Sequence, residues 1–192
     1  TPIEETLEAL HDVVKAGKAR YIGASSMHSW QFAKALYTAD LNGWTRFATM
    51  QDHYNLLYRE EEREMLPFCV DQGIGAIPWS PLARGPLGPA VVRADVALGD
   101  RRVRSHPLQR RRPADRRLVD SVIDVADKRG IAPAQVALAW LLGRAGVDAP
   151  IVGATKAHHL DDAIAAVDLR LDQSEIESLE KAYQPHAVAG FR

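Results

Sequence analysis

Short apolar runs alternate with amphipathic stretches along this chain, and the alternation restricts the possible folds more than any other feature. Within the amphipathic stretches, apolar residues recur at helical spacing, as at Leu160, Ile164 and Val167. Strands that alternate with helices form parallel sheets, because two parallel neighbours need a crossover connection between them. Four runs have the character of strands: 21–24, 47–51, 75–80 and 150–153. The sequence therefore predicts an α/β fold with four parallel strands and covering helices.

The stretches around these strands have the start and stop signals of helices. Thr1 with Glu4, and Asp172 with Glu175, have the spacing of capping boxes, in which two side chains satisfy free backbone N–H groups. We expect helices over 1–17, 28–39, 60–71, 113–128, 132–142 and 172–183, and one more after Lys156. The chain therefore opens on a helix, with no strand before it.

The composition is that of an ordinary soluble domain. The 192 residues are 46% hydrophobic and 26% charged, with a formal net charge of −1. This balance favours neither nucleic acid nor a membrane as a partner, and the longest apolar run, Val136–Leu142, is far shorter than a membrane span. The single cysteine, Cys69, is expected to be a small buried hydrophobe. A cytoplasmic location is the simplest expectation, because no signal-peptide pattern opens the chain and no disulfide is available.

Polar residues stand at the carboxyl ends of the predicted strands. Parallel α/β folds place their sites at this edge of the sheet. After the last predicted strand, the chain turns at Gly153 and enters a helix. The backbone N–H groups of the turn and the dipole of the helix together favour the binding of an anion. The alternative is that Gly153 is only a turn residue and that Lys156 is solvated. The polar residues at the strand ends are Ser25, Ser26, Gln51, Ser80 and Thr155.

Four of these segments, in this order, resemble the aldo-keto reductase family in the C-terminal half of its (β/α)8 TIM barrel. They are Tyr21–Ser26, Gln51 with Tyr54 and Asn55, Pro78–Gly85, and Ile151–Lys156. The resemblance implies one partial barrel domain over residues 1–192. Within the family, the Ser25–Ser26 pair and the segment Trp79–Leu82 resemble the bacterial branch near the potassium-channel β subunits.

The resemblance implies that NADPH is the cofactor and that the first three segments hold its nicotinamide half. Ser25, Ser26 and Gln51 would hydrogen-bond the carboxamide, and Trp79 would stack on the nicotinamide ring. Three residues would run along the pyrophosphate: Ser80, Leu82 and Arg84.

The last segment would hold the adenosine end of NADPH. Gly153, Thr155 and Lys156 would meet the 2′-phosphate, which favours NADPH over NADH. His159 stands where the family often has Arg or Gln, and Asp162 matches a position near the adenine.

The family's catalytic Asp, Tyr, Lys and His belong to the half of the barrel that would precede Thr1. His11, His53 and Tyr54 do not match those positions, so no catalytic residue and no metal site is predicted. The implied function is NADPH-dependent reduction of a small aldehyde or ketone by hydride transfer, in a chain with the cofactor-binding half only. The alternatives are a non-catalytic nucleotide-binding or assembly protein, or a truncated gene product. Self-association through the open barrel edge is also expected.

The segment 87–113 departs from the family pattern. Eight arginines lie between Arg101 and Arg117, and Asp115 is the only acid among them. Three interpretations remain open: a basic arm for phosphate or nucleic acid, a local frameshift pair, or a variable surface loop.

Overall fold

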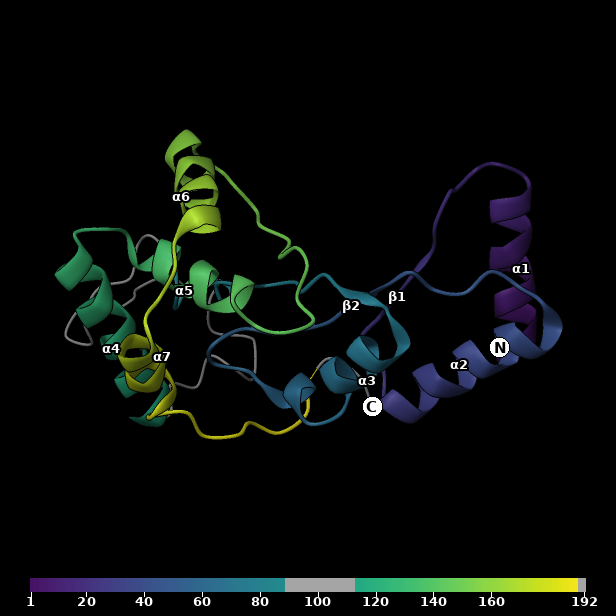
Figure 1. Cartoon of the computed structure of the whole chain (residues 1–192), viewed down its shortest axis with the longest axis horizontal. Coiled ribbons are helices and arrows are strands. Elements are labelled where there is room, and N and C mark those ends of the chain that lie inside the picture. Colours follow the sequence, from purple (N-terminus) through teal and green to yellow (C-terminus); the bar gives the residue numbers. More distant parts are fainter. Residues whose placement is uncertain (89–112, 190–192) are drawn as a thin grey trace.

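The computed structural model describes residues 1–88 and 113–189, which form an elongated molecule (Figure 1). Helices α1 and α2 lie at one end, α4 to α7 lie at the other, and a short sheet lies between them. In chain order the elements are α1 (Ile3–Lys15), β1 (Gly23–Ser25), α2 (Ser29–Asn42), β2 (Thr49–Gln51), the 3₁₀ turn η1 (Glu60–Glu62), α3 (Met65–Gln72), β3 (Gly75–Ala76), α4 (Pro113–Arg129), α5 (Pro133–Leu142), α6 (Ala157–Asp168) and α7 (Gln173–Glu180). Within the described ranges, no helix is both long and apolar enough to cross a membrane.

The sheet is parallel, as predicted, with the strand order β1-β2-β3. Gly23 pairs with Thr49 at the start of β1, and a Cβ added at Gly23 would lie 2.4 Å from the Thr49 hydroxyl oxygen. Any other residue at this position would therefore force Thr49 to shift.

The prediction of four strands is wrong: among the described residues the sheet has three strands, and the segment predicted at 150–153 is not one of them. Ile151 pairs with Trp79 only through an isolated parallel bridge, with one backbone bond of 2.8 Å from the Ile151 N–H to the Pro78 carbonyl. Pro78 has no backbone N–H, so it interrupts the ladder and shortens β3. Ile151 and Val152 stay 43% and 38% exposed, because no further strand covers them among the described residues.

The predicted helix over 60–71 is also interrupted. It consists of η1 followed by α3, which begins at Met65. A continuous helix from Glu60 would place Pro67 in its interior, where its ring clashes with a carbonyl and no N–H is available. The break instead places Pro67 in the first turn of α3, where no N–H is required.

The helix ends agree with the capping predictions in one of two cases. The Asp172 carboxylate accepts the Glu175 N–H at 2.9 Å, and the Glu175 carboxylate accepts the Asp172 N–H at 2.8 Å, so this capping box is confirmed. The capping box at Thr1 is wrong, because Pro2 occupies the N-cap of α1 and no side chain caps it.

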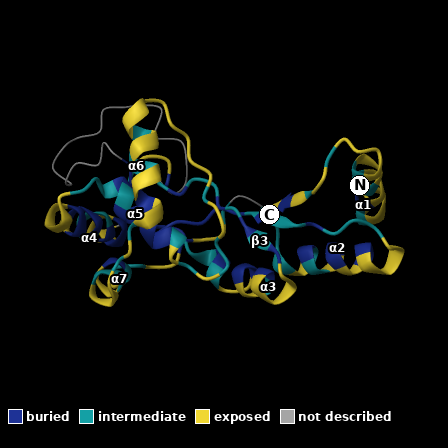
Figure 2. Cartoon of the chain, turned by 45° about the horizontal axis from the view of Figure 1, so that its top comes forward, coloured by how far each residue is buried: buried dark blue, intermediate teal, exposed yellow. Residues whose placement is uncertain are grey.

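Two hydrophobic cores divide the molecule (Figure 2). The N-terminal core joins α1, α2, α3 and the sheet, with Phe32 at 5.9 Å from both Phe47 and Phe68 between ring centroids. Cys69 is buried in this core, as predicted. The C-terminal core joins α4, α5 and α7 with the segment after β2, and Trp140 lies within it.

The basic segment is described only at its two ends. Leu87 is fully buried in the C-terminal core, and Pro113 begins α4. Asp115 is buried and pairs with His186 at 2.9 Å. Residues 89–112, with most of the arginines, lie outside the described residues. The structure therefore tests none of the three interpretations of this segment.

Candidate functional site

The loop after β3 has an unusual backbone. Ser80, Ala83 and Arg84 have φ values of 53°, 51° and 59°, in the left-handed region that costs most residues roughly 1–2 kcal/mol each. The loop is held by neighbours: Asn55 Nδ2 donates to the Ser80 carbonyl at 2.9 Å, and the Ala83 N–H donates to the same carbonyl at 2.9 Å. Strained backbone that is maintained in this way is concentrated at functional sites.

This loop forms one wall of a cavity of about 360 Å³, which we name the first cavity. The opposite walls are α5, the segment after Pro150 and the first turns of α6. Seven of the twelve residues predicted to bind the cofactor line it: Ser80, Leu82, Arg84, Gly153, Thr155, His159 and Asp162.

The side of the cavity near α6 has space and polar groups for an anion. A Cβ added at Gly153 would meet no atom within 4 Å, and Gly153 has no positive φ, so neither packing nor the backbone requires glycine there. Thr155 Oγ1 lies 3.4 Å from His159 Nδ1, and Gln135 Nε2 donates to the Asp162 carboxylate at 2.7 Å. A ligand can therefore approach the backbone closely at Gly153.

Lys156 lies at the N-cap of α6 and is exposed, but it does not line the cavity. No side chain caps this helix, so the N–H groups of Ala157 and His158 are available to an anion, while the His159 N–H donates to the Lys156 carbonyl at 3.1 Å. Lys156 is next to Thr155 in the chain, and its four-carbon stem is flexible. Its ammonium group can therefore serve the same anion as the helix terminus.

The four residues predicted for the nicotinamide lie together at the ends of β1, β2 and β3. Ser25 Oγ and the Ser26 N–H both donate to the Gln51 carbonyl, at 3.0 and 3.1 Å. Trp79 Nε1 donates to Ser26 Oγ at 3.2 Å. The structure thus brings these four residues together beside the first cavity, but none of them lines it.

The sequence did not predict the rings that stack with Trp79. The His53 ring lies 4.2 Å from the Trp79 ring at an angle of 12°, and the Tyr58 ring lies 4.5 Å from His53 at 15°. We name these three rings the aromatic stack. The Arg84 guanidinium carbon lies 5.4 Å from the Trp79 ring centroid. Since His53 covers one face of the indole, a stacked nicotinamide needs the other face, and Arg84 must move aside for it.

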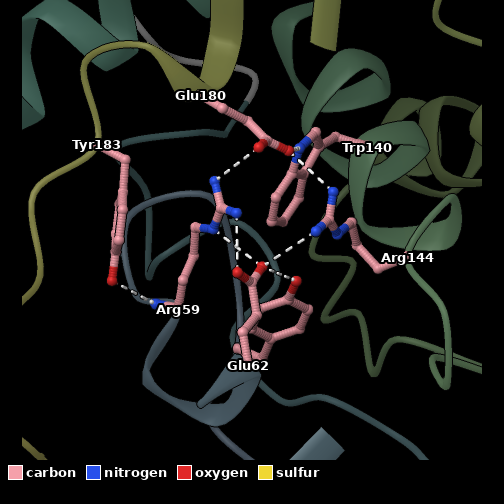
Figure 3. A network of polar contacts seen from close by, with 7 residues as sticks. Arg59, Glu62, Trp140, Arg144, Glu180 and Tyr183 are labelled. Carbon is pink, nitrogen blue, oxygen red and sulfur yellow. Dashed lines mark hydrogen bonds and ion pairs between the residues drawn. The ribbon is translucent and has the colours of Figure 1, made fainter. Parts of the chain in front are cut away.

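A polar network, shown in Figure 3, begins at Arg59, directly after Tyr58 of the aromatic stack. Arg59 donates to both carboxylate oxygens of Glu62, at 2.9 and 2.8 Å, and pairs with Glu180 at 3.2 Å. Arg144 and the Trp140 indole each donate to Glu180 at 2.9 Å. The network therefore links η1, α5 and α7, and its residues are occupied with one another.

Tyr54 belongs to the same network and is not placed to act as an acid. Its hydroxyl donates to Glu62 at 2.5 Å, and its side chain is buried. Burial and then the bond to Glu62 raise the pKa of Tyr54 far above its usual value. A general acid for neutral pH needs a lowered tyrosine pKa, so the structure gives Tyr54 the opposite properties.

Comparisons with known proteins identify the fold. A model of the aldo/keto reductase family matches residues 1–184. The chain is 45% identical over 190 residues to versiconal hemiacetal acetate reductase of Aspergillus parasiticus, covering 98% of this chain and 55% of that protein. It is 43% identical over 190 residues to an aldo-keto reductase of Fusarium vanettenii, covering 98% of this chain and 51% of that protein.

The structure is similar to a solved one, that of the thermostable aldo-keto reductase Tm1743 in complex with the inhibitor epalrestat. The TM-score is 0.71 at 25% identity, over 95% of this chain and 55% of that one. The expected likeness to a bacterial branch near the potassium-channel β subunits is corrected, because these sequence relatives are fungal. The chain spans about half the length of the relatives that it matches. The chain belongs to the aldo/keto reductase family.

Proposed function

We propose that this chain is the cofactor-binding part of an NADPH-dependent aldo-keto reductase. The observation that supports this most directly is the first cavity, which lies beyond the strand ends and is lined by seven residues for which the resemblance to the family implies a cofactor role. Its polar groups suit an anionic dinucleotide, because Arg84 and His159 line it and Lys156 flanks the helix terminus beside it.

The residues of the chain bind and orient the cofactor in this proposal. Arg84 and the backbone after β3 hold the pyrophosphate, while Lys156 and the first turn of α6 hold the 2′-phosphate. Trp79 is fixed by Ser26 and His53, which sets the plane against which a nicotinamide ring can stack. Bound NADPH supplies a hydride for a carbonyl carbon of a small aldehyde or ketone.

A tryptophan fluorescence titration tests the proposal. NADPH should quench the intrinsic fluorescence of the chain, and 2′,5′-ADP should compete with it, because both have the phosphates that the first cavity recognises. A Trp79→Phe variant should lose most of the quenching by NADPH while binding 2′,5′-ADP as tightly. Absence of NADPH binding by the folded chain would refute the proposal.

One observation favours a second candidate function, a non-catalytic nucleotide-binding or assembly protein. Tyr54, next to His53 in the chain, is engaged with Glu62 and has a raised pKa, which does not suit a proton donor. Aldehyde-dependent loss of NADPH absorbance separates the two functions. Turnover supports the reductase, and binding without turnover supports the second function.

Self-association belongs to the proposal as well. Tyr21, Trp30 and Tyr37 are more than half exposed in the N-terminal part, and β1 is an edge strand. Unpaired sheet edges and exposed apolar side chains both promote contact between chains. Sedimentation at increasing concentration should show a rising mass, and a monomer throughout would argue against it.

A further inference from the structure

A second cavity, of about 200 Å³, lies at the other end of the aromatic stack from Arg84. Its lining comes from the segment before α2, from η1 with the start of α3, and from the tail after α7. Apolar or partly apolar side chains form much of the wall: Met27, Tyr58, Met65 and Val188. The polar part of the lining has three acids, Glu60, Glu61 and Glu64, beside His28, Ser29 and Arg63.

Glu61 differs from the other acids of this second cavity. It is only 5% exposed, and no hydrogen bond or ion pair joins its carboxylate to another described residue. Glu60 pairs with Arg63 at 3.2 Å, and Glu64 is exposed to solvent. The guanidinium in the lining is therefore engaged, and Glu61 has no counter-ion in the described part of the chain.

Asp52 adds a second buried acid behind Glu61. It is 1% exposed, and neither carboxylate oxygen has a hydrogen-bond partner among the described residues. Burial, with the nearby Asp52 and Glu60, raises the pKa of Glu61 to about 8, and burial raises the pKa of Asp52 to about 7. The negative charges of both acids also contribute to the raised pKa values of Cys69 and Tyr58.

A buried carboxylate without a partner is costly, and a cation removes much of that cost. Within the described ranges, no group of three or more His, Cys, Asp or Glu side chains could hold a metal ion. The combination of one buried carboxylate with an apolar wall suits a compact ammonium group on an aliphatic stem, since such stems pack along apolar surface.

We propose that the second cavity binds a primary ammonium group, on a free alkylamine or on a lysine side chain, with Glu61 as its counter-ion. The ammonium nitrogen donates to Glu61, and the aliphatic stem packs on Met27, Met65 and Val188. Asp52 strengthens the site by adding negative charge behind Glu61. This site is separate from the cofactor cavity and does not depend on the proposed reductase function.

Proton competition gives the site a definite pH dependence. Free Glu61 is protonated below about pH 8, whereas the ammonium group binds its ionised form. Each unit of acidification below that value should therefore weaken binding by up to about tenfold. The titratable or charged groups around Glu61 are Asp52 after β2, Tyr58 before η1, His28 before α2, Glu60, Arg63 and Glu64 around η1, and Cys69 in α3. Of these, Asp52 titrates in the same range and should steepen the dependence near pH 7.

Calorimetric titration of the intact chain with n-butylammonium chloride tests the site, with 1-butanol as the neutral ligand of similar shape. At pH 8.5 we expect millimolar or tighter binding of butylammonium, at least tenfold tighter than that of butanol, and a large loss at pH 6.5. Equal affinity for the two ligands, or equal affinity of butylammonium at both pH values, would overturn the proposal.

Variants make the test specific. Glu61→Gln should weaken butylammonium binding at least tenfold and remove most of its pH dependence, leaving the smaller part due to Asp52, while Glu8→Gln, a matched change on exposed α1, should do neither. Glu61→Gln removes a buried unpaired acid, and its thermal melting should verify the fold. Unchanged binding in Glu61→Gln would refute the site. Tighter binding of blocked N-acetyl-lysine methylamide than of butylammonium would support it and identify a lysine side chain as the ligand, whereas the reverse order would support it and identify a free amine.

Discussion

The first and second cavities are joined by one stack of rings and differ in charge. Arg84 lines the first cavity and reaches Trp79, while Tyr58 lines the second and stacks on His53. The first cavity is larger, has the Arg84 guanidinium in its lining and follows a strained loop. The second is smaller and acidic, with a buried unpaired carboxylate. One ring system thus separates the proposed site for anions from the proposed site for cations.

The comparison teaches that charge, more than shape, distinguishes the two cavities. Both are lined partly by apolar side chains, so neither excludes a small organic molecule by polarity alone. Phosphate groups would be repelled at ionised Glu61, above about pH 8, and an ammonium group would be repelled at Arg84. The following predictions test this division.

The largest expected effect concerns turnover. The 192-residue chain alone should show no measurable NADPH-dependent reduction of a simple aldehyde, because the described residues provide no tuned proton donor beside the first cavity. General acid catalysis typically contributes about 10²–10⁴-fold. The measurement is NADPH absorbance with the purified chain at its verified mass. Robust turnover would mean that a residue beside the stack acts as the acid.

The second prediction concerns the buried acids. Folded pKa values of about 7 for Asp52 and about 8 for Glu61 lie above the ordinary values of 3.8 and 4.5. The folded chain then binds more protons than the unfolded chain, so stability should fall as pH rises from about 4 to 8. Asp52→Asn should reduce this fall by about 2–4 kcal/mol, the equivalent of two to three pKa units. Urea unfolding at pH 5 and pH 8 measures it, and an equal pH dependence in both proteins would contradict it.

The third prediction concerns the first cavity. Lys156→Ala should weaken NADPH binding far more than NADH binding, because only NADPH has the 2′-phosphate. A lost charge-assisted hydrogen bond costs about 1.5–3 kcal/mol, which is roughly 10- to 150-fold in affinity. Lys181→Ala, an exposed lysine at the end of α7, is the matched control and should change neither affinity. Equal losses for the two cofactors would show that Lys156 does not discriminate between them.

The smallest expected effect concerns the aromatic stack. His53→Ala removes two stacked contacts and should destabilise the chain by about 1–3 kcal/mol. His53→Phe keeps a ring between Trp79 and Tyr58 and should retain most of that stability. Thermal or urea unfolding of both variants measures the difference. Equal destabilisation would show that the ring itself does not support Trp79.

Sequence patterns predicted the parts of the molecule that depend on local signals. The parallel sheet and the Asp172 capping box follow from periodicity and local spacing, and the resemblance to the family supplied seven candidate residues that line one cavity. Pro67 and Pro78 were visible in the sequence, yet their effects on the 60–71 helix and on the strand at 75–80 were not recognised. In both cases the missing proline N–H decided the outcome.

Long-range contacts were not accessible from the sequence. The position of His53 between Trp79 and Tyr58, and the burial of Glu61 without a partner, depend on which loops meet in space. The run of three glutamates in η1 has no pattern that singles out the middle one. The prediction of a fourth strand at 150–153 was wrong because a strand there needs pairing neighbours, and the described residues do not supply them.

Amide NMR of the intact chain with NADPH tests the central claim most directly, since it reports on both cavities in one titration. The account predicts that the largest shift changes occur at Gly85, Gly153 and Thr155 around the first cavity, while Glu61 and Met65 beside the second cavity change little. Saturable changes centred on Glu61 and Met65, or no saturable change at Gly153 and Thr155, would contradict the assignment of the first cavity to the cofactor.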